Sequence, residues 1–501
     1  MFQKQATESA GRRGTRPAVP AEPPPAVPAE PPPADRPGLT LAAVGVVQFL
    51  VSLDLSVVNL GLPEIAAGLG FTGADVTWVI HAYALTFGGL LLLGGKLADR
   101  YGRRRVLLCG LGLFALASLA GGFAQAQGHL VAARAAQGVG AAALAPAALA
   151  VLTVTFPSGR ARARAFGVWS AMNAAGGALG VLVGGVLTEY AGWRWVMWVN
   201  VPMALVALAL AWRGVAADRP AARHTRPDVL GAVLGTGGMT ALVYGIVGTD
   251  RHGWAAPQTI GAVAGAVVLL VGFVLVQRAT TRDALLPLGL FRLRTVSGAN
   301  TFNLLLGAAM ASAFYFLSLY LQDVLGHGPA TAGLMFLPFA LGVVVGSVVA
   351  IRLGSRMPSR SLLVLGGLMT AVGFAWFGRI GADGTFLADV LGPSLVTSIG
   401  FGLCLGPVVA TATVGVPERQ SGVASGVLNT SRQLGASLGL AALGTAAAAR
   451  AGTSPDVEAL TGGYAFGLTL GAVLLGAAVV VALLVLPRPT GRTTSLERST
   501  S

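Results

Sequence analysis

One acidic residue interrupts the first long apolar stretch of the chain. Asp54 is the only acid between residues 39 and 62, and it lies within about one helical turn of the middle of that stretch. A charge inside a bilayer costs at least ~2.5 kcal/mol, so such residues usually face a cavity and serve a function. Apolar surroundings favour a neutral carboxylate and hydration favours the ionised form. We predict that Asp54 binds and releases a proton and that this step is coupled to substrate release. The alternatives are a role in substrate binding, or a protonated Asp54 hydrogen-bonded to a neighbouring helix.

A single basic residue stands well inside the apolar segments of the first half of the chain. Arg134 lies four or five residues into the stretch 130–155. A long side chain in that position can extend to the membrane surface, which is the structural alternative to a functional role. Arg432 of the second half is also inside an apolar stretch and is more readily explained by such an extension.

Further polar residues in apolar stretches are candidates for lining a substrate pocket, because such pockets combine apolar walls with a few polar groups. Interhelical hydrogen bonding is the alternative. The set is Tyr83, Gln137, Asn173, Asn303, Tyr315 and Arg432. The sequence has no metal-ligand cluster, nucleotide-binding loop or catalytic nucleophile pattern. It therefore predicts no enzyme activity and no cofactor, and it does not indicate ATP as an energy source.

The composition decides which elements position these residues. Of 501 residues, 54% are hydrophobic and 11% charged, and the mean hydropathy is +0.72. Soluble domains carry about 25% charged residues, so an ordinary globular protein is excluded. The 71 glycines fit helices that pack closely in a membrane. The net charge of +14 sits in short runs between apolar stretches, so we expect lipid and not nucleic acid as the partner of these charges.

Fourteen apolar stretches of about 17–26 residues are each long enough to cross a ~30 Å hydrocarbon core as a helix. They run over 39–62, 77–95, 106–124, 130–155, 165–187, 196–212, 229–247, 259–276, 296–321, 331–351, 362–380, 387–412, 422–448 and 464–486. With the amino terminus inside, 28 of the 34 Lys and Arg residues fall on the inner face and 4 on the outer face. This asymmetry predicts a multi-pass protein of the cytoplasmic membrane with both termini in the cytoplasm.

The chain repeats itself. At an offset of 259 residues, Gly176 and Gly180 correspond to Gly435 and Gly439, and Asn173 corresponds to Arg432. Two matched halves are typical of transporters. The predicted parts are a disordered Pro-rich cytoplasmic tail, a six-helix bundle, a two-helix insertion, a second six-helix bundle and a short cytoplasmic tail. Their bounds are 1–37, 38–215, 216–295, 296–487 and 488–501.

A charged segment between the second and third apolar stretches carries a specific resemblance. Gly95-Lys-Leu-Ala-Asp-Arg-Tyr-Gly-Arg-Arg-Arg105 closely resembles the signature loop of the major facilitator superfamily. Gly95 and Gly102 would permit a tight turn, and the charges would form a network that latches the cytoplasmic side. The predicted latch is Gly95, Asp99, Arg100, Gly102, Arg103 and Arg104. The alternative is plain positive charge on an inner loop.

Further segments resemble the fourteen-helix drug:proton antiporter branch of that superfamily. Residues 54–63, 134–140, 193–202 and 319–338 resemble its motifs in the first, fourth, sixth and ninth to tenth helices. The resemblance implies that Arg134 tunes the proton site through its field. Glycines at spacings of four, Gly176, Gly180, Gly184 and Gly185, resemble the antiporter motif of the fifth helix, with Val181 in place of its proline. Close helix packing is the alternative explanation.

We therefore expect an all-α membrane protein with the major facilitator fold, in which 14 helices form two pseudo-symmetric halves around an inserted pair. The resemblance implies a multidrug efflux transporter, a monomer that exchanges protons for a small hydrophobic or amphiphilic drug or secondary metabolite by alternating access. The alternatives are a proton-coupled importer, which the Val181 departure keeps open, and a membrane sensor that transports nothing.

Overall fold

The protein is an array of long helices in a computed structural model. The structure describes residues 36–156, 159–216, 228–280, 284–354, 356–416, 421–452 and 456–487. Within these ranges there are helices and no strands. Both predicted terminal tails lie outside the described residues, apart from Arg36 and Pro37.

Fourteen helical stretches of the described residues are long and apolar enough to cross a membrane, and each overlaps one of the predicted spans. The first six spans consist of α1 (Pro37–Val57) with η1 (Asn59–Gly61) and α2 (Leu62–Leu69), η2 (Gly73–Thr77) with α3 (Trp78–Tyr101), α4 (Arg103–Gly122), α5 (Gln127–Thr155), α6 (Gly159–Ala191), and α7 (Arg194–Trp198) with α8 (Asn200–Gly214). The next two are α9 (Val229–His252) and α10 (Pro257–Ala279). The predicted all-α fold with fourteen spans is confirmed.

The last six spans follow a short η3 (Leu288–Arg292). They consist of α11 (Arg294–Leu319) with η4 (Tyr320–Val324), α12 (Pro329–Met335) with α13 (Leu337–Gly354), α14 (Ser359–Phe377), η5 (Phe386–Leu391) with α15 (Gly392–Thr413), α16 (Ser421–Ala451) and α17 (Val457–Leu484). Both η4 and η5 are π-helical turns. Such turns are rare and frequently lie at functional sites.

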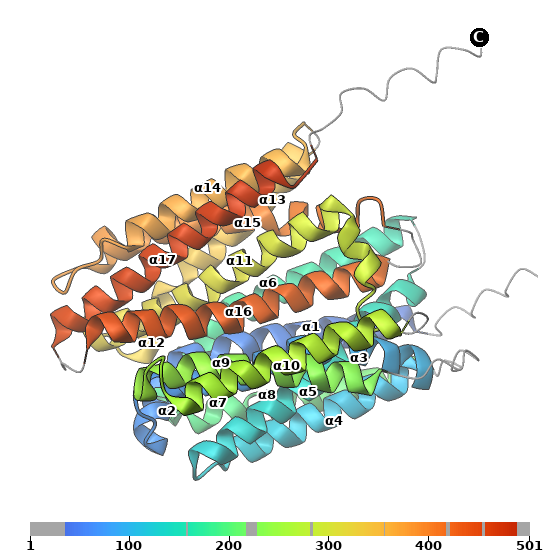
Figure 1. The fold of residues 1–501 in the computed structure, drawn as a ribbon. Helices are drawn as coiled ribbons and strands as arrows, with labels where there is room; N and C mark the ends of the chain where they lie inside the picture. The colour runs from blue at the N-terminus through green and yellow to red at the C-terminus, as the bar shows by residue number, and fades with distance from the viewer. Residues whose placement is uncertain are drawn as a thin grey trace, which may run out of the picture. The chain divides into compact units, whose positions relative to one another are not determined.

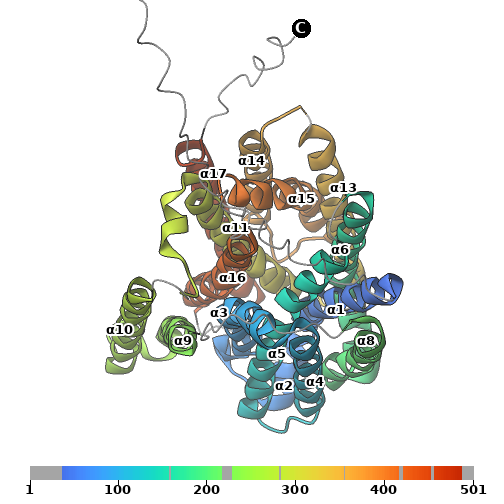
Figure 2. The ribbon, with the colours of Figure 1, turned by 90° about the vertical axis from the view of Figure 1, so that its right-hand side faces the viewer.

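The helices pack in two groups of six spans (Figure 1). α1 packs against α6 and α8, and α3 and α4 pack against α5. In the second group α11 packs against α16 and α17, and α15 packs against α13 and α14. The groups meet where α6 contacts α12 and α13, and where α3 contacts α16. Figure 2 shows α6 beside α13 and α3 beside α16.

The inserted pair α9 and α10 packs at the side of these two groups (Figure 2). α9 contacts both α3 and α16, whereas α10 packs mainly on α9. Only 11% of the 18-residue apolar stretch of α10 is buried inside the protein, which is the smallest share among the fourteen spans. The described residues, from 36 to 487, belong to one compact unit. The predicted division of that unit at residues 216 and 295 stays a prediction.

Glycines allow the same close approach in both groups. A Cβ on Gly176 or Gly180 of α6 would lie 2.5 or 2.8 Å from a backbone oxygen of α1, the oxygen of Phe49 or Leu53. Their counterparts Gly435 and Gly439 of α16 approach the backbone of α11 in the same way. The sequence repeat at offset 259 is therefore also a repeat of helix packing.

Candidate functional site

Asp54 and Arg134 form a buried ion pair. The Arg134 guanidinium donates through Nη1 to Oδ2 of Asp54 at 2.9 Å, and the two side chains are 2% and 0% exposed. Asp54 lies near the end of α1 and Arg134 in the second turn of α5, so tertiary packing brings together residues 80 positions apart. This contact excludes the alternative in which the Arg134 side chain extends to the membrane surface.

Two amide side chains complete the hydrogen bonding of the carboxylate. Asn200, the first residue of α8, donates to Oδ1 of Asp54 at 2.7 Å. Gln137 of α5 donates to the same oxygen at 3.3 Å and accepts from Arg134 at 2.9 Å. The Gln137 amide also donates to the hydroxyl of Ser118 in α4 at 2.7 Å. Three N–H groups therefore satisfy an ionised Asp54.

The third helix holds the guanidinium from the other side. Arg134 Nε donates to the carbonyl oxygen of Val79 at 3.0 Å, and the guanidinium carbon lies 4.5 Å from the ring centroid of Tyr83. Both residues belong to α3. A buried charge is tolerated when it is paired and hydrogen-bonded, and these contacts meet that requirement for Arg134.

We call Asp54, Arg134, Gln137, Asn200, Ser118 and Tyr83 the carboxylate cluster. It joins α1, α3, α4, α5 and α8 in the interior of the first group of helices. Chemically, a proton arriving on Asp54 would remove the charge that Arg134 neutralises. The hydrogen bonds of this carboxylate join α1 to α5 and α8.

The four glycines of the fifth span lie at helix contacts. Gly176, Gly180 and Gly184 approach the backbone of α1 at Phe49, Leu53 and Val57, and Gly185 approaches Pro329 of α12. The first three fix α1 beside α6 near Asp54, and the fourth joins α6 to the second group. Close packing therefore accounts for all four positions.

The charged segment at residues 95–105 is helical almost throughout, contrary to the expectation of a loop. Gly95 lies inside α3, where a Cβ would make ordinary contact with Pro146 at 3.6 Å, so it forms no turn. Gly102 alone separates α3 from α4, with a φ of 95°. The expected role of Gly95 in a turn is therefore wrong, because helix α3 continues to Tyr101.

Arg104 ties the start of α4 to the end of α8. It donates to the carbonyl oxygen of Trp212 at 2.6 Å and lies over the indole ring of that residue. Arg100 lies over the ring of Tyr101, 5.4 Å from its centroid. Asp99 is exposed and Arg103 is half-buried at the same end of the helices. Their function as a latch stays a prediction.

The six expected pocket residues divide between different surroundings. Tyr83 and Gln137 belong to the carboxylate cluster and are fully buried. Asn303 is also buried and donates to the carbonyl oxygen of Leu428 at 2.8 Å, which joins α11 to α16. Tyr315 is buried among apolar residues of the second group.

Asn173 and Arg432 occupy corresponding places in the two groups. Asn173 of α6 accepts a hydrogen bond from Gln48 of α1 at 2.7 Å. Arg432 of α16 packs against Gly307 of α11 and donates to Asn429 at 3.0 Å. Both are half-buried and each faces the first helix of its own group.

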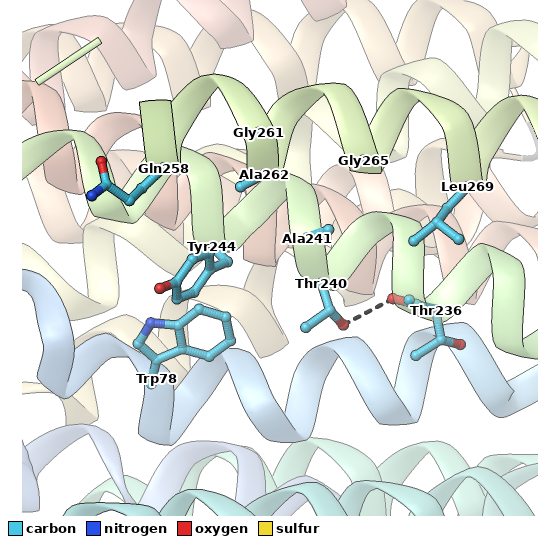
Figure 3. A pocket seen from close by; sticks show the side chains of 11 residues that line it. Trp78, Thr236, Thr240, Ala241, Tyr244, Gln258, Gly261, Ala262, Gly265 and Leu269 are labelled. Carbon is cyan, nitrogen blue, oxygen red and sulfur yellow. Dashed lines mark hydrogen bonds between the residues drawn. The ribbon is translucent and has the colours of Figure 1, made fainter. Parts of the chain in front are cut away.

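A groove of about 680 Å³ lies between the inserted pair and the start of α3 (Figure 3). Trp78 and Tyr244 form one end of the groove, and Gly261, Ala262 and Gly265 of α10 form its wall. No carboxylate, histidine, lysine or arginine is present among the described residues that line it. The groove therefore supplies shape and apolar surface but no group that exchanges a proton near neutral pH.

The bond from Asn200 to Asp54 could not be predicted from the sequence, where Asn200 is only part of the motif at residues 193–202. Ser118, which accepts a hydrogen bond from Gln137, is likewise absent from the predicted site. A polar side chain in an apolar span is itself a signal that it bonds to something, but the sequence does not say to which helix. His81 of α3 was also missed: it is fully buried, and its ring nitrogens have no hydrogen-bond partner within the described part of the chain.

Comparison with known protein families shows to which family the chain belongs. A family model described as Major Facilitator Superfamily matches residues 44–440, which covers the carboxylate cluster and most of both groups of helices. The chain belongs to the major facilitator superfamily. The expected family is confirmed.

Several relatives of this superfamily member carry names that refer to antibiotics. The chain is 42% identical to the cephamycin export protein of Amycolatopsis lactamdurans over 443 residues, which cover 88% of this chain and 90% of that protein. It is 40% identical to the puromycin resistance protein of Streptomyces alboniger, covering 89% and 90% of the two chains. It is 32% identical to the methylenomycin A resistance protein of Bacillus subtilis, with coverage of 81% and 87%.

Solved structures show the same fold at low sequence identity. The peptide transporter PepTSo of the POT family is 16% identical, with a TM-score of 0.63 over 89% of this chain and 98% of that chain. A peptide transporter POT in complex with sulfate is 18% identical, with a TM-score of 0.62 over 89% and 96%. At this level of identity the likeness concerns the fold alone.

Proposed function

We propose that this chain exports hydrophobic antibiotics or related secondary metabolites from the cytoplasm in exchange for protons. The observation that carries the proton part is the buried Asp54–Arg134 pair, in which one carboxylate is shared between a guanidinium and two amides. The substrate class is supported by the relatives named for cephamycin export and for resistance to puromycin.

The orientation follows from the distribution of Lys and Arg, which favours cytoplasmic termini. The outer end of the bundle is then the end at which α6 finishes and α12 begins. The two groups of helices contact each other there: Ser318 of α11 donates to the carbonyl oxygen of Asn59 at 3.0 Å, and Gly333 of α12 packs against Val181 of α6. In the proposed cycle, the structure corresponds to a state closed on the outside.

In this cycle, proton binding at Asp54 drives the conformational change. With Asp54 ionised, the carboxylate cluster holds α1 to α5 and α8. A proton entering from the outer side neutralises Asp54 and leaves the Arg134 charge without its counterion, so the local packing of α1 changes. Asn59 of η1, in the same span and only five residues beyond Asp54, lies at the contact with α11. One span therefore connects the proton site with the outer closure.

A panel of antibiotics tests the proposal. Cells that express the chain are compared with cells carrying an empty vector for growth in puromycin, cephamycin C and methylenomycin A, and for retention of radiolabelled puromycin with and without a protonophore. We expect increased resistance to at least one compound and lower retention that the protonophore abolishes. Increased puromycin retention in expressing cells would indicate import, and equal growth in every compound together with equal puromycin retention would contradict export.

A further inference from the structure

The outer contact between the two groups includes the carboxylate of Glu189. Glu189 lies in the last turn of α6, one turn beyond Gly185. Its Oε2 accepts a hydrogen bond from the backbone N–H of Ala330 in α12 at 2.8 Å. The bond therefore joins a side chain of the first group to the main chain of the second group.

Glu189 is exposed, and its carboxylate lies against the backbone of the second group. A Cβ at Gly328 would lie 2.6 Å from Oε2 of Glu189, so the carboxylate is packed directly against the chain that enters α12. Gly185, four residues earlier on the same face of α6, is in backbone contact with Pro329. Pro329 has no N–H, which makes Ala330 the first donor in this helix. The carboxylate therefore contacts the backbone at the start of α12.

This hydrogen bond stabilises the contact between the two groups and can break when they separate. A hydrogen bond to an ionised carboxylate is about twice as strong as a neutral one. Glu64 of α2 lies near enough to Glu189 to interact with it electrostatically and has the same sign, so it does not form an ion pair with it. The other outer bond, from Ser318 to Asn59, is between neutral groups. Glu189 consequently provides a charge-assisted link between the two groups at this end.

We infer that Glu189 is a positioning residue that holds the outer end of the transporter closed through Ala330. The inference rests on the proposed function, because an exporter that works by alternating access must break this bond each time it opens outward. Removal of the carboxylate then favours the outward-open state.

Distances between spin labels test the inference without any substrate. One pair, Gln125→Cys in the α4–α5 turn and Leu387→Cys in η5, reports on the outer end, and a second pair, Arg105→Cys and Ile351→Cys, reports on the inner end. All four positions are exposed. Cys109→Ser removes the exposed native thiol, and Cys404 is buried. Pulsed electron paramagnetic resonance then measures the distance between the two labels of each pair in lipid nanodiscs.

In Glu189→Ala we expect longer distances for the outer pair and shorter distances for the inner pair. Glu189→Gln should shift both less, since an amide oxygen still accepts the bond without the charge. Glu458→Ala, which removes an exposed carboxylate of α17 at the same end, should match the parent.

Unchanged distances in Glu189→Ala would overturn the inference. So would an increase of both distances, which indicates general loosening, or the same shift in Glu458→Ala. The distances are measured independently of export. If the chain exports nothing but Glu189→Ala still lengthens the outer distances and shortens the inner ones, the proposed function is refuted and the role of Glu189 is not.

Discussion

At the scale of single residues, the chemistry of the chain concentrates on one carboxylate with three N–H donors. Breaking a buried ion pair by removing one partner leaves an uncompensated charge and costs about 3–5 kcal/mol. Arg134→Ala removes the guanidinium from Asp54, Gln137 and the Val79 carbonyl at once. We expect it to lower the free energy of unfolding in detergent by about that amount.

The double variant separates the charge from the lost packing. Asp54→Asn in the Arg134→Ala background replaces the unpaired carboxylate with a neutral amide, so most of the lost stability should return. The measurement is a four-membered cycle of denaturant titrations followed by tryptophan fluorescence. Losses that simply add in the double variant would show that the two residues do not interact energetically.

At the scale of elements, the approach of α6 to α1 positions Asp54. A Cβ at Gly180 would lie 2.8 Å from the Leu53 oxygen and 3.0 Å from Ser56. We expect Gly180→Ala to push the helices apart and to destabilise the protein by about 1–3 kcal/mol, the usual cost of overpacking. Export should fall with it, because Leu53 adjoins Asp54 in α1.

A glycine on the same helix supplies the control. Nothing lies within 4 Å of a Cβ at Gly167. Gly167→Ala should leave the melting temperature unchanged or raise it, because alanine is the better helix former. Equal loss of melting temperature in both variants would mean that the close approach is unimportant.

The connection between α3 and α4 allows a similar comparison. Gly102 has a φ of 95°, which a side chain rarely adopts, whereas Gly95 is helical and has room for a methyl group. Gly102→Ala should cost about 1–3 kcal/mol of stability, and Gly95→Ala should be tolerated. Thermal unfolding of the two purified variants tests this, and a larger loss in Gly95→Ala would contradict it.

At the scale of the whole molecule, the spans could be predicted from the sequence because length and hydropathy alone determine them. The short interruptions of the α-helices could not be predicted, such as the η1 turn after α1 or the π-helical turns η4 and η5. These depend on local hydrogen bonding at helix ends. Gly95 illustrates the same limit, since a glycine pattern does not show whether a helix continues through it.

The site was predictable residue by residue but not as a cluster. Asp54 and Arg134 stood out as charges in apolar segments. That Asn200 bonds to Asp54 across 146 positions depends on which helices are neighbours, and a single sequence does not contain that information. Glu189 gave no signal because it lies near a span end, where a carboxylate is ordinary.

Proton exchange during export is the central claim, and everted membrane vesicles test it most directly. Respiration acidifies the vesicle interior, which corresponds to the outer side, and a pH-sensitive dye records the gradient when an exported compound from the antibiotic panel is added. Wild-type vesicles should lose part of the gradient as protons leave in exchange for the drug, and vesicles with Asp54→Asn should keep it. A gradient that collapses equally in Asp54→Asn, or that stays intact while the wild type transports the drug, would contradict the account.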